Sequence, residues 1–333
     1  MKLKDIGEFG FIERIAAQGI VRTHGVVKAI GDDCAVVSLE GPDYLLITTD
    51  MLVERVHFVA DWSGPDVLGA KSLATNISDI AACGGRPLDA FVSLAIPERI
   101  EVEWLDLFYS GMRDLGRDFG VNILGGDTTR SKVDLVINVA VTGTVPRDQV
   151  LFRHTARPGD LIVLTGPTGE SGAGCEILSG STRIPADIAD RLINAHLRPR
   201  PHVREGRKLA ESRACTAAID VSDGLSSDLG HICRESGLAA IVYEERLPIS
   251  DALVEAAAIL GKDPLEWVLH GGEDYVLLAA VSPEEWTALE DQVKQEGMSF
   301  HCIGKLLPGV EMELERVDGS RQILARKGWN HFR

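Results

Sequence analysis

The chain has 333 residues, of which 45% are hydrophobic and 25% are charged, a composition typical of a globular protein. Its 34 basic and 50 acidic residues give a formal net charge of −16, which argues against nucleic acid or an anionic membrane as partner. No run of about 18 uncharged apolar residues occurs, so we expect no membrane span. The first residues lack the basic-then-apolar order of a signal peptide, so we expect a cytoplasmic protein.

The first part of the chain combines strand-like and helical patterns. Apolar residues recur with the helical period at 65–85 and again at 102–120, where Gly120 ends the pattern. In the second helix Tyr109 lies opposite the face formed by Phe108 and Met112, which makes it available to a ligand, although an exposed tyrosine is the plainer explanation. We expect a strand-rich N-terminal domain over residues 1–150, with strands at 35–39, 44–50, 89–97 and 134–145.

A second domain is expected over residues 151–333. Residues 153–160 read as a linker, in which Pro158 and Gly159 form a turn before a strand at 161–166. A glycine-rich loop at 166–174 follows, and then mostly helices, at 185–197, 201–212, 226–236 and 250–260, with strands near 275–281, 300–304 and 310–316. The six cysteines are scattered without zinc-ligand spacing, so we expect free thiols.

Aspartates follow apolar runs at several points of the chain. Each of them has an ordinary structural explanation: "GDD" suits a turn, "SDGL" suits a helix cap, and Asp79 on its helix can face solvent. As a set, buried carboxylates are costly without positive partners, and too few lysines or arginines lie nearby in sequence to supply them. The set comprises Asp32, Asp33, Asp50, Asp79, Asp127, Asp220 and Asp223.

Ligands that are all oxygen suit hard cations such as Mg²⁺, and several aspartates indicate more than one ion. Glycines at 31, 125–126, 166–174 and 271–272 allow close backbone approach to a ligand. The sequence lacks a P-loop, a Rossmann GxGxxG unit, a protein-kinase catalytic loop and a GxSxG elbow. The residues therefore predict metal-assisted chemistry on a phosphate or a nucleotide.

Seven motifs, taken in order, resemble the thiamine-monophosphate kinase family. They are "GDDCAVV", "TTDMLVERVHF", "NISDIAACGG", "GGDTTR", "IDVSDGLSSDLGHI", "HGGEDYVLL" and "GWNHF", and they cover nearly the whole chain. The family belongs to a superfamily of ATP-binding synthetases that includes aminoimidazole ribonucleotide synthetase and selenophosphate synthetase. The resemblance implies an α/β (α+β) fold of two domains and a homodimer whose N-terminal sheets join into a barrel between subunits.

The resemblance also implies the reaction, which is transfer of the γ-phosphoryl group of ATP to thiamine monophosphate with Mg²⁺. A monovalent cation is a further candidate cofactor. Motif by motif, Tyr109, Gly126, Asp127, Arg153 and Ser222 would contact ATP, and His57, Glu273 and Trp329 would contact the acceptor. The expected metal ligands are Asp33, Thr48, Thr49, Asp50, Asp79, Asp127, Asp220 and Asp223, with Asp32 in a supporting role.

The chemistry fits without a general base, because the acceptor phosphate is already a nucleophile at neutral pH. Mg²⁺ would neutralise the repulsion between phosphates, and Arg153 could add a fixed charge, although an arginine in a linker can simply be solvated. Trp329 could stack on the rings of the acceptor or only anchor the tail, and Glu273 could pair with its cation or be a turn residue. Arg55 departs from the family, which more often has glycine there, so the local loop conformation near His57 is open.

Two alternatives stay open at this point. One is a relative in the same superfamily that uses ATP to activate an amide oxygen or selenide; "GGDTTR" and "GWNHF" argue against it, as does the lack of an N-terminal reactive cysteine. The other is a catalytically silent module that binds metal and nucleotide. The completeness of the aspartate set argues against the second alternative.

Overall fold

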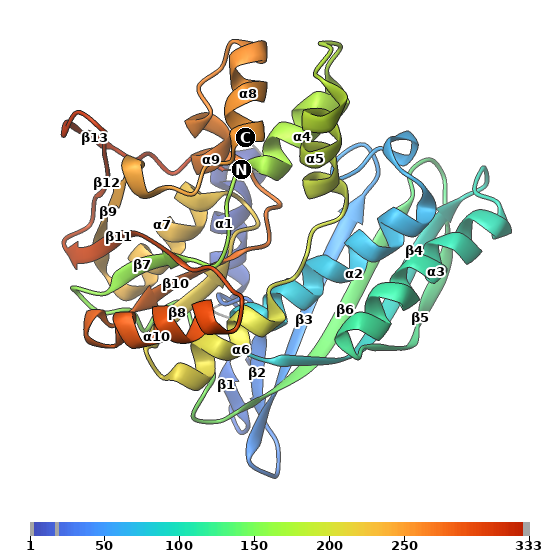
Figure 1. Ribbon diagram of the computed structural model, residues 1–333. Helices are drawn as coiled ribbons and strands as arrows, with labels where there is room; N and C mark the ends of the chain where they lie inside the picture. Colours follow the sequence, from blue (N-terminus) through green and yellow to red (C-terminus); the bar gives the residue numbers. More distant parts are fainter. Residues whose placement is uncertain (1–2, 17–19, 329–333) are drawn as a thin grey trace.

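A computed structural model describes residues 3–16 and 20–328 and contains two β-sheets, one in each half of the chain (Figure 1). It is a mixed α/β protein of two parts, which confirms the expected fold class. The barrel between subunits stays a prediction. Among the described residues, no helix is long and apolar enough to cross a membrane.

The first half of the chain builds a six-stranded sheet of order β1-β2-β3-β6-β4-β5. All pairs are antiparallel except β4 with β5. The elements are α1 (Leu3–Ala16), β1 (Val26–Lys28), β2 (Ala35–Ser38), β3 (Asp43–Val53), α2 (Pro65–Ala82), β4 (Arg86–Pro97), α3 (Val102–Phe119), β5 (Asn122–Ser131) and β6 (Val136–Pro146).

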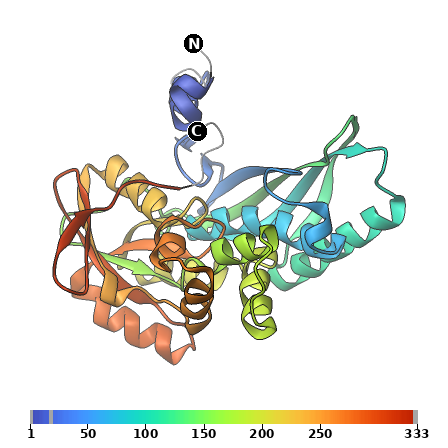
Figure 2. The ribbon, with the colours of Figure 1, turned by 90° about the horizontal axis from the view of Figure 1, so that it is seen from above.

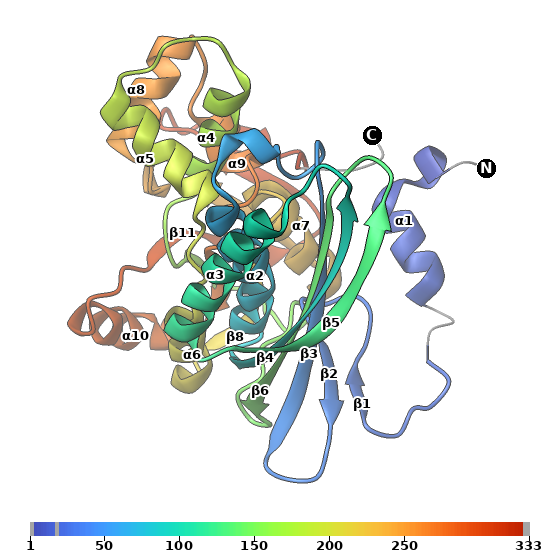
Figure 3. The same cartoon turned by 90° about the vertical axis from the view of Figure 1, so that its right-hand side faces the viewer.

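Within residues 3–16 and 20–328, helices α2 and α3 cover one face of this first sheet and leave the other face open (Figure 3). Side chains alternate along each strand, so Leu46 and Val92 are buried against the helices, whereas Met51 and Phe91 are exposed on the other face. Close approach of α2 to α3 depends on two glycines, because a Cβ at Gly69 or Gly111 would fall within 2 Å of the facing backbone. The first sheet therefore has an inner, helix-covered face and an outer, open face.

The second half builds a seven-stranded sheet of order β13-β12-β9-β11-β7-β10-β8. Its elements are β7 (Leu161–Leu164), α4 (Glu170–Ser179), α5 (Ala186–Leu197), α6 (Val203–Ser212), β8 (Cys215–Asp220), α7 (Leu225–Ser236), β9 (Leu238–Tyr243), α8 (Asp251–Leu260), α9 (Leu265–His270), β10 (Leu277–Val281), α10 (Pro283–Gln295), β11 (His301–Pro308), β12 (Met312–Glu315) and β13 (Arg321–Ile323).

Both faces of the second sheet are covered. Along β7, Ile162 and Leu164 join a core with residues of α4, α5, α7, α8 and α9, whereas Val163 points to a smaller core with α6 and α10. Ala81 and Ala82 of α2 belong to this smaller core, so α2 packs against both sheets. Figure 2 shows the two parts side by side, with α1 projecting from the body between them.

The strands expected at 35–39, 44–50, 89–97, 134–145 and 161–166 are present, but the sequence analysis missed β1, β5, β8, β9 and β13. Residues 122–131 of β5 are almost all exposed and include two adjacent glycines, which are poor strand formers, and the strand forms at the edge of the sheet through pairing with β4. Strand β8 is rich in alanine and lacks the alternating pattern because both of its faces are covered.

Candidate active site

Carboxylates from both halves of the chain meet where α2 runs between the two sheets. Asp33 lies in the turn between β1 and β2, Asp79 on α2, and Asp220 at the end of β8. One carboxylate oxygen from each of these three residues lies within 4.8 Å of the others. These three residues are called the aspartate cluster below, and all three were expected as metal ligands.

Polar side chains of α2 connect this cluster to both sheets. Ser78 donates a 2.6 Å hydrogen bond to Asp220 of the second sheet. On the first sheet, the Thr48 hydroxyl donates to Asp79, and the Asp50 backbone amide donates to Asn76 at 3.1 Å. Since Thr48 and Asp50 both point to the inner face of β3, the helix holds them beside the cluster.

Burial and mutual repulsion raise the pKa values of these carboxyl groups. Burial is the main cause for Asp33 and Asp220, whose pKa values rise to about 6 and about 8. The pKa of Asp79 is raised well above its ordinary value by burial and then by the charges of Asp50, Asp220 and Asp33. Like charges held together in this way favour a bound cation or a bound proton.

Asp32 and Asp33 are each paired with a cation, which corrects the expectation that positive partners were lacking: Lys28 is near in sequence, and Arg153 is distant. Lys28 Nζ lies 3.2 Å from an Asp32 oxygen, and the Arg153 guanidinium donates to Asp33. Lys28 precedes Asp32 by only four residues, whereas Arg153 lies 120 residues after Asp33 and could not be found from local sequence. The Asp32 side chain is 1% exposed and also accepts from the backbone amides of Asp33 and Arg153.

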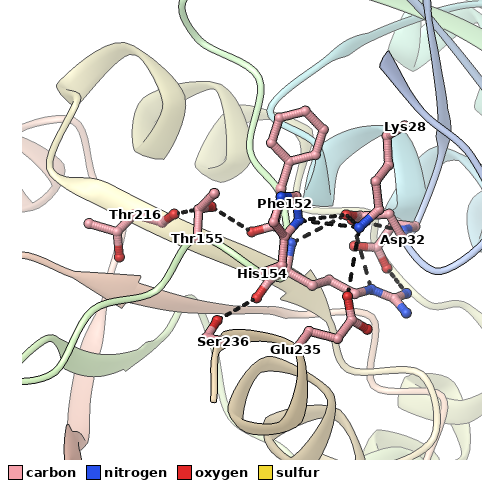
Figure 4. Close-up of polar contacts among 10 residues, drawn as sticks. Lys28, Asp32, Phe152, His154, Thr155, Thr216, Glu235 and Ser236 are labelled. Carbon is pink, nitrogen blue, oxygen red and sulfur yellow. Dashed lines mark hydrogen bonds and ion pairs between the residues drawn. The ribbon is translucent and has the colours of Figure 1, made fainter. Parts of the chain in front are cut away.

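Hydrogen bonds fix the segment that carries Arg153, and Figure 4 shows the neighbouring residues Phe152, His154 and Thr155 of this segment. Ser236 at the end of α7 donates to the Arg153 carbonyl at 3.2 Å, and Thr155 donates to the Thr216 carbonyl at 2.6 Å. Lys28 also lies 3.8 Å from Glu235. Arg153 is thus an anchored side chain, 18% exposed, and not the solvated arginine that a linker would favour.

Two loops of the second half of the chain adjoin the aspartate cluster. Ser222 and Asp223 follow β8, and the Ser222 carbonyl accepts a 2.8 Å hydrogen bond from the Glu273 amide. A Cβ at Gly272 would lie 2.6 Å from that carbonyl, so the close contact between the loops requires glycine. The pKa of Asp223 is raised to about 6, mainly by burial. Ser222, Asp223 and Glu273, to which the motifs assign different roles, therefore lie on two loops in direct contact.

His57 and Arg55 lie in the segment after β3. The Val53 amide donates a 2.9 Å hydrogen bond to His57 Nδ1. The ring is also near enough to Glu273 to help lower the pKa of that carboxyl group. Arg55 adopts φ 65°, the left-handed conformation that glycine prefers, and its side chain pairs with Asp134 at 2.5 Å. The loop thus has the backbone conformation expected for glycine, although the residue is arginine.

Four expected site residues lie apart from the cluster in this chain. Thr49 and Asp127 point to the outer face of the first sheet, because Thr49 aligns with Phe91, and Asp127 aligns through β4 and β6 with Met51. Gly126 sits beside Asp127 on β5, three strands from β3, which is about 14 Å at the usual strand spacing. Tyr109 on α3 is partly buried against Phe108, at 5.5 Å between ring centres. Trp329 lies outside the described residues.

The sequence analysis missed a buried polar group beside this site. Lys71 on α2 pairs with Glu273, and His196 of α5 contacts both residues. A lysine in the otherwise apolar and small-residue stretch "LGAKSLA" is the signal that could have identified it. Asp274, also missed, accepts hydrogen bonds from the Gly169 and Ser171 amides and so ties the glycine-rich loop to the Glu273 segment.

Comparisons with known proteins identify the family. The N-terminal domain of AIR synthase related proteins matches residues 31–145, and the C-terminal domain matches residues 157–316. Thiamine-monophosphate kinase of Escherichia coli strain K12 is 37% identical over 98% of this chain and 98% of its own length. The chain belongs to the thiamine-monophosphate kinase family.

Further relatives of this thiamine-monophosphate kinase family member span the whole chain as well. The Bacillus subtilis strain 168 kinase is 35% identical over 98% of this chain and 99% of its own length. A solved structure described as AaThiL complexed with AMPPCP and TMP superposes with a TM-score of 0.86 at 33% identity and covers 99% of both chains. Thiamine monophosphate kinase from Aquifex aeolicus gives a TM-score of 0.80 at 30% identity, covering 97% of this chain and 99% of its own.

Proposed function

We propose that this protein transfers the γ-phosphoryl group of ATP to thiamine monophosphate and releases thiamine diphosphate and ADP. The observation that carries the proposal is the aspartate cluster at the junction of the two sheets, in a chain of this family. A relative of the same fold binds AMPPCP, an ATP analogue, together with TMP. An ATP-dependent enzyme that activates an amide oxygen or selenide is a weaker candidate, because the chain belongs to the kinase family.

The residues present fit Mg²⁺. Asp33 has a buried carboxylate oxygen without a hydrogen-bond partner in the described part of the chain, and the neighbouring donors are oxygens of Asp79 and Asp220. Asp33, Thr48, Asp50, Asp79, Asp220 and Asp223 are the residues that would hold it, and a monovalent cation stays a further prediction. When bound, Mg²⁺ supplies the positive charge that lets two anionic phosphates approach.

The residues of the chain then position the reactants. The acceptor phosphate is the nucleophile, so no side chain needs to remove a proton from it. Arg153 places a fixed guanidinium beside the carboxylates, where it can stabilise negative charge on the transferred group. Ser222 lies on the loop that approaches from the second sheet to contact ATP. His57, which is close to Glu273, would contact the rings of the acceptor together with that carboxylate.

A homodimer would explain the residues on the outer face. This face carries the exposed apolar side chains Met51 and Phe91 in one continuous sheet, with Ile47 on β3 and Leu124 on β5. Patches of this kind on a sheet are typical of interfaces between subunits. We propose that a second copy covers the face, and that Thr49, Gly126 and Asp127 serve the site of the partner subunit.

We further propose that the domain boundary lies at residue 150, between β6 and β7. Residues 1–150 would bind ATP and Mg²⁺ and form the dimer, and residues 151–333 would complete the site. The cytoplasmic location likewise remains a proposal.

The test is an assay of the purified protein with ATP, Mg²⁺ and thiamine monophosphate, with products separated by chromatography. We expect thiamine diphosphate and ADP in equal amounts. Formation of ADP without thiamine diphosphate would contradict thiamine monophosphate as the acceptor. A protein that binds AMPPCP but yields neither product would be a catalytically silent module. Thiamine in place of thiamine monophosphate is the matched control, because it lacks the nucleophilic phosphate and should give no product.

A further inference from the structure

Lys71 is a buried cation where the two halves of the molecule pack against each other. It lies on α2 with its side chain 3% exposed, and its Nζ is 2.8 Å from a Glu273 oxygen. The same ammonium group is 3.3 Å from His196 Nε2. A lysine is rarely buried without a specific partner, because removal of its charge from water is costly. Its position therefore depends on Glu273 and His196, which both belong to the second half of the chain.

His196 contacts both Lys71 and Glu273 without adding a charge. Burial, and then the charge of Lys71, lower the pKa of His196 to about 4, so the ring is neutral at pH 7. With Nε2 accepting from the lysine, Nδ1 carries the proton and faces Glu273 at 3.3 Å and the Ser171 hydroxyl at 3.1 Å. Lys71, His196 and Glu273 thus form one neutral network, called the lysine–glutamate network below.

The backbone around Glu273 is held in an unusual conformation. Glu273 and Tyr275 have φ values of 61° and 53°, in the left-handed region that side chains rarely adopt. The Glu273 amide is bound to Ser222, and Asp274 is bound to the Gly169 and Ser171 amides. Such local strain persists only where surrounding contacts enforce it, and it is concentrated at functional sites. The Glu273 carboxylate is therefore fixed from the backbone as well as by Lys71.

Lys71 lies on α2 in the same i, i+4, i+8 row as Thr75 and Asp79, and Asp79 is the α2 member of the aspartate cluster. Asp79 is eight positions further along the helix, which is about 12 Å away at the usual rise per residue. Thr75 lies between them; burial raises the pKa of Asp50 to about 6, and a side-chain hydrogen bond from Thr75 partly offsets this rise. One helix face therefore presents a carboxylate for phosphate chemistry near its end and a lysine-bound glutamate near its middle. That order matches an acceptor with a phosphate at one end and a cationic ring at the other.

We propose that Lys71 is a positioning residue for the acceptor, which keeps the Glu273 carboxylate ionised and oriented toward the acceptor's positively charged ring. The inference rests on the proposed function. The contacts of Glu273 with the Lys71 ammonium group and with the neutral His196 ring both use Oε2, and the side chain keeps 25% exposure. The carboxylate can therefore meet a ligand while Lys71 holds its other oxygen.

The titratable groups around Glu273 determine how its ionisation depends on pH, and this dependence can test the proposal. Burial raises the pKa of Glu273, but Lys71 from α2, His196 from α5 and His57 from the segment after β3 lower it, and the net direction is downward. The remaining titratable neighbours are Asp274 and Tyr275 on its own segment and Cys175 of α4. Without Lys71 the effect of burial is largely unopposed, so the carboxyl group takes up a proton at higher pH.

The experiment measures KM for thiamine monophosphate and for ATP between pH 5.5 and 8.5. Lys71→Met should raise KM for thiamine monophosphate about tenfold or more, increasingly as the pH falls, because one pKa unit corresponds to a factor of about ten. KM for ATP should stay unchanged. Lys71→Arg should restore most of the affinity because it keeps the charge. Lys294→Met, which removes an exposed pair with Glu290 on α10, is the matched control and should behave like the unaltered protein.

Glu273→Gln and the double variant show whether Lys71 acts through Glu273. Glu273→Gln should raise KM for thiamine monophosphate without the pH dependence, and Lys71→Met/Glu273→Gln should be no worse than Glu273→Gln alone. If Lys71→Met does not fold, the double variant still tests the proposal, because it contains no unpaired buried charge. An unchanged KM in Lys71→Met, a parallel rise in KM for ATP, or additive effects would each overturn the proposal. Absence of thiamine diphosphate with the unaltered protein would instead contradict the proposed function.

Discussion

Two groups of buried charges lie along one face of α2, and they are built in opposite ways. In the aspartate cluster, carboxylates face one another, and burial raises the pKa values of Asp33 and Asp220. In the lysine–glutamate network, each charge has its partner within the chain, and the pKa of Glu273 is lowered. Within the first group Arg153 pairs with Asp33 alone, so the three carboxylates need a further cation from outside. The second group is complete and can define geometry before any ligand arrives.

The largest expected effect comes from breaking the aspartate cluster. Asp220→Asn keeps the size of the side chain but removes a charge that would hold Mg²⁺, so turnover should fall by about three orders of magnitude, given the several kcal/mol that a metal site supplies. The initial rate of thiamine diphosphate formation measures it, with thermal unfolding to confirm the fold. Asp114→Asn, on the exposed surface of α3, is the control. Turnover within a few fold of the unaltered protein would show that Asp220 holds no metal.

The second prediction tests whether residues on the outer face of the first sheet serve the active site of the partner subunit, whereas those on the inner face serve their own. Asp127→Asn and Asp220→Asn should each be inactive alone. After the two are mixed and their subunits exchange, about one quarter of full activity should return, because half of the dimers are mixed and one of their two sites is intact. Recovery of activity as subunits exchange is the measurement. Two active parents, or a mixture that stays inactive after exchange has been verified, would contradict the sharing of residues between subunits.

The third prediction concerns the neutral histidine of the lysine–glutamate network. The pKa of His196 is about 4 in the folded protein and 6.5 when exposed, so the unfolded chain takes up a proton first as the pH falls. The free energy of unfolding should therefore decline between pH 6.5 and 4, by about 2 kcal/mol more in the unaltered protein than in His196→Gln. Urea unfolding at several pH values measures this difference. Equal slopes for both proteins would contradict a buried neutral His196.

The smallest expected effect is at Arg55. Because Arg55 adopts φ 65°, Arg55→Gly should relieve strain of about 1 kcal/mol, which is partly offset by greater chain entropy in the unfolded state. The lost pair with Asp134 is largely exposed and contributes little. We expect a melting temperature that is unchanged or raised by a few degrees, with KM values unaltered. A clear loss of stability would show that the arginine side chain, and not the backbone conformation, holds this loop.

Sequence alone predicted most of the aspartate cluster and little of the lysine–glutamate network. Asp33 and Asp220 could be found because each follows an apolar run, and Asp79 because it interrupts an apolar and small-residue helical stretch. Their motifs also occur in an order that resembles one family. Lys71 and His196 could not be paired in this way, because 125 residues separate them and only the packing of α2 against α5 brings them together. The same reason hid the Arg153–Asp33 pair. The opposite orientations of Thr48 and Thr49 became visible only once β3 was paired in register.

The most direct test of the central claim, that the aspartate cluster is a cation site, is calorimetric titration of Mg²⁺ into the protein saturated with AMPPCP. The account predicts saturable binding of more than one Mg²⁺ per chain in the unaltered protein and in Lys71→Arg. In Asp79→Asn it predicts loss of at least one Mg²⁺ or a large drop in affinity. The same stoichiometry and affinity in Asp79→Asn as in the unaltered protein would contradict it.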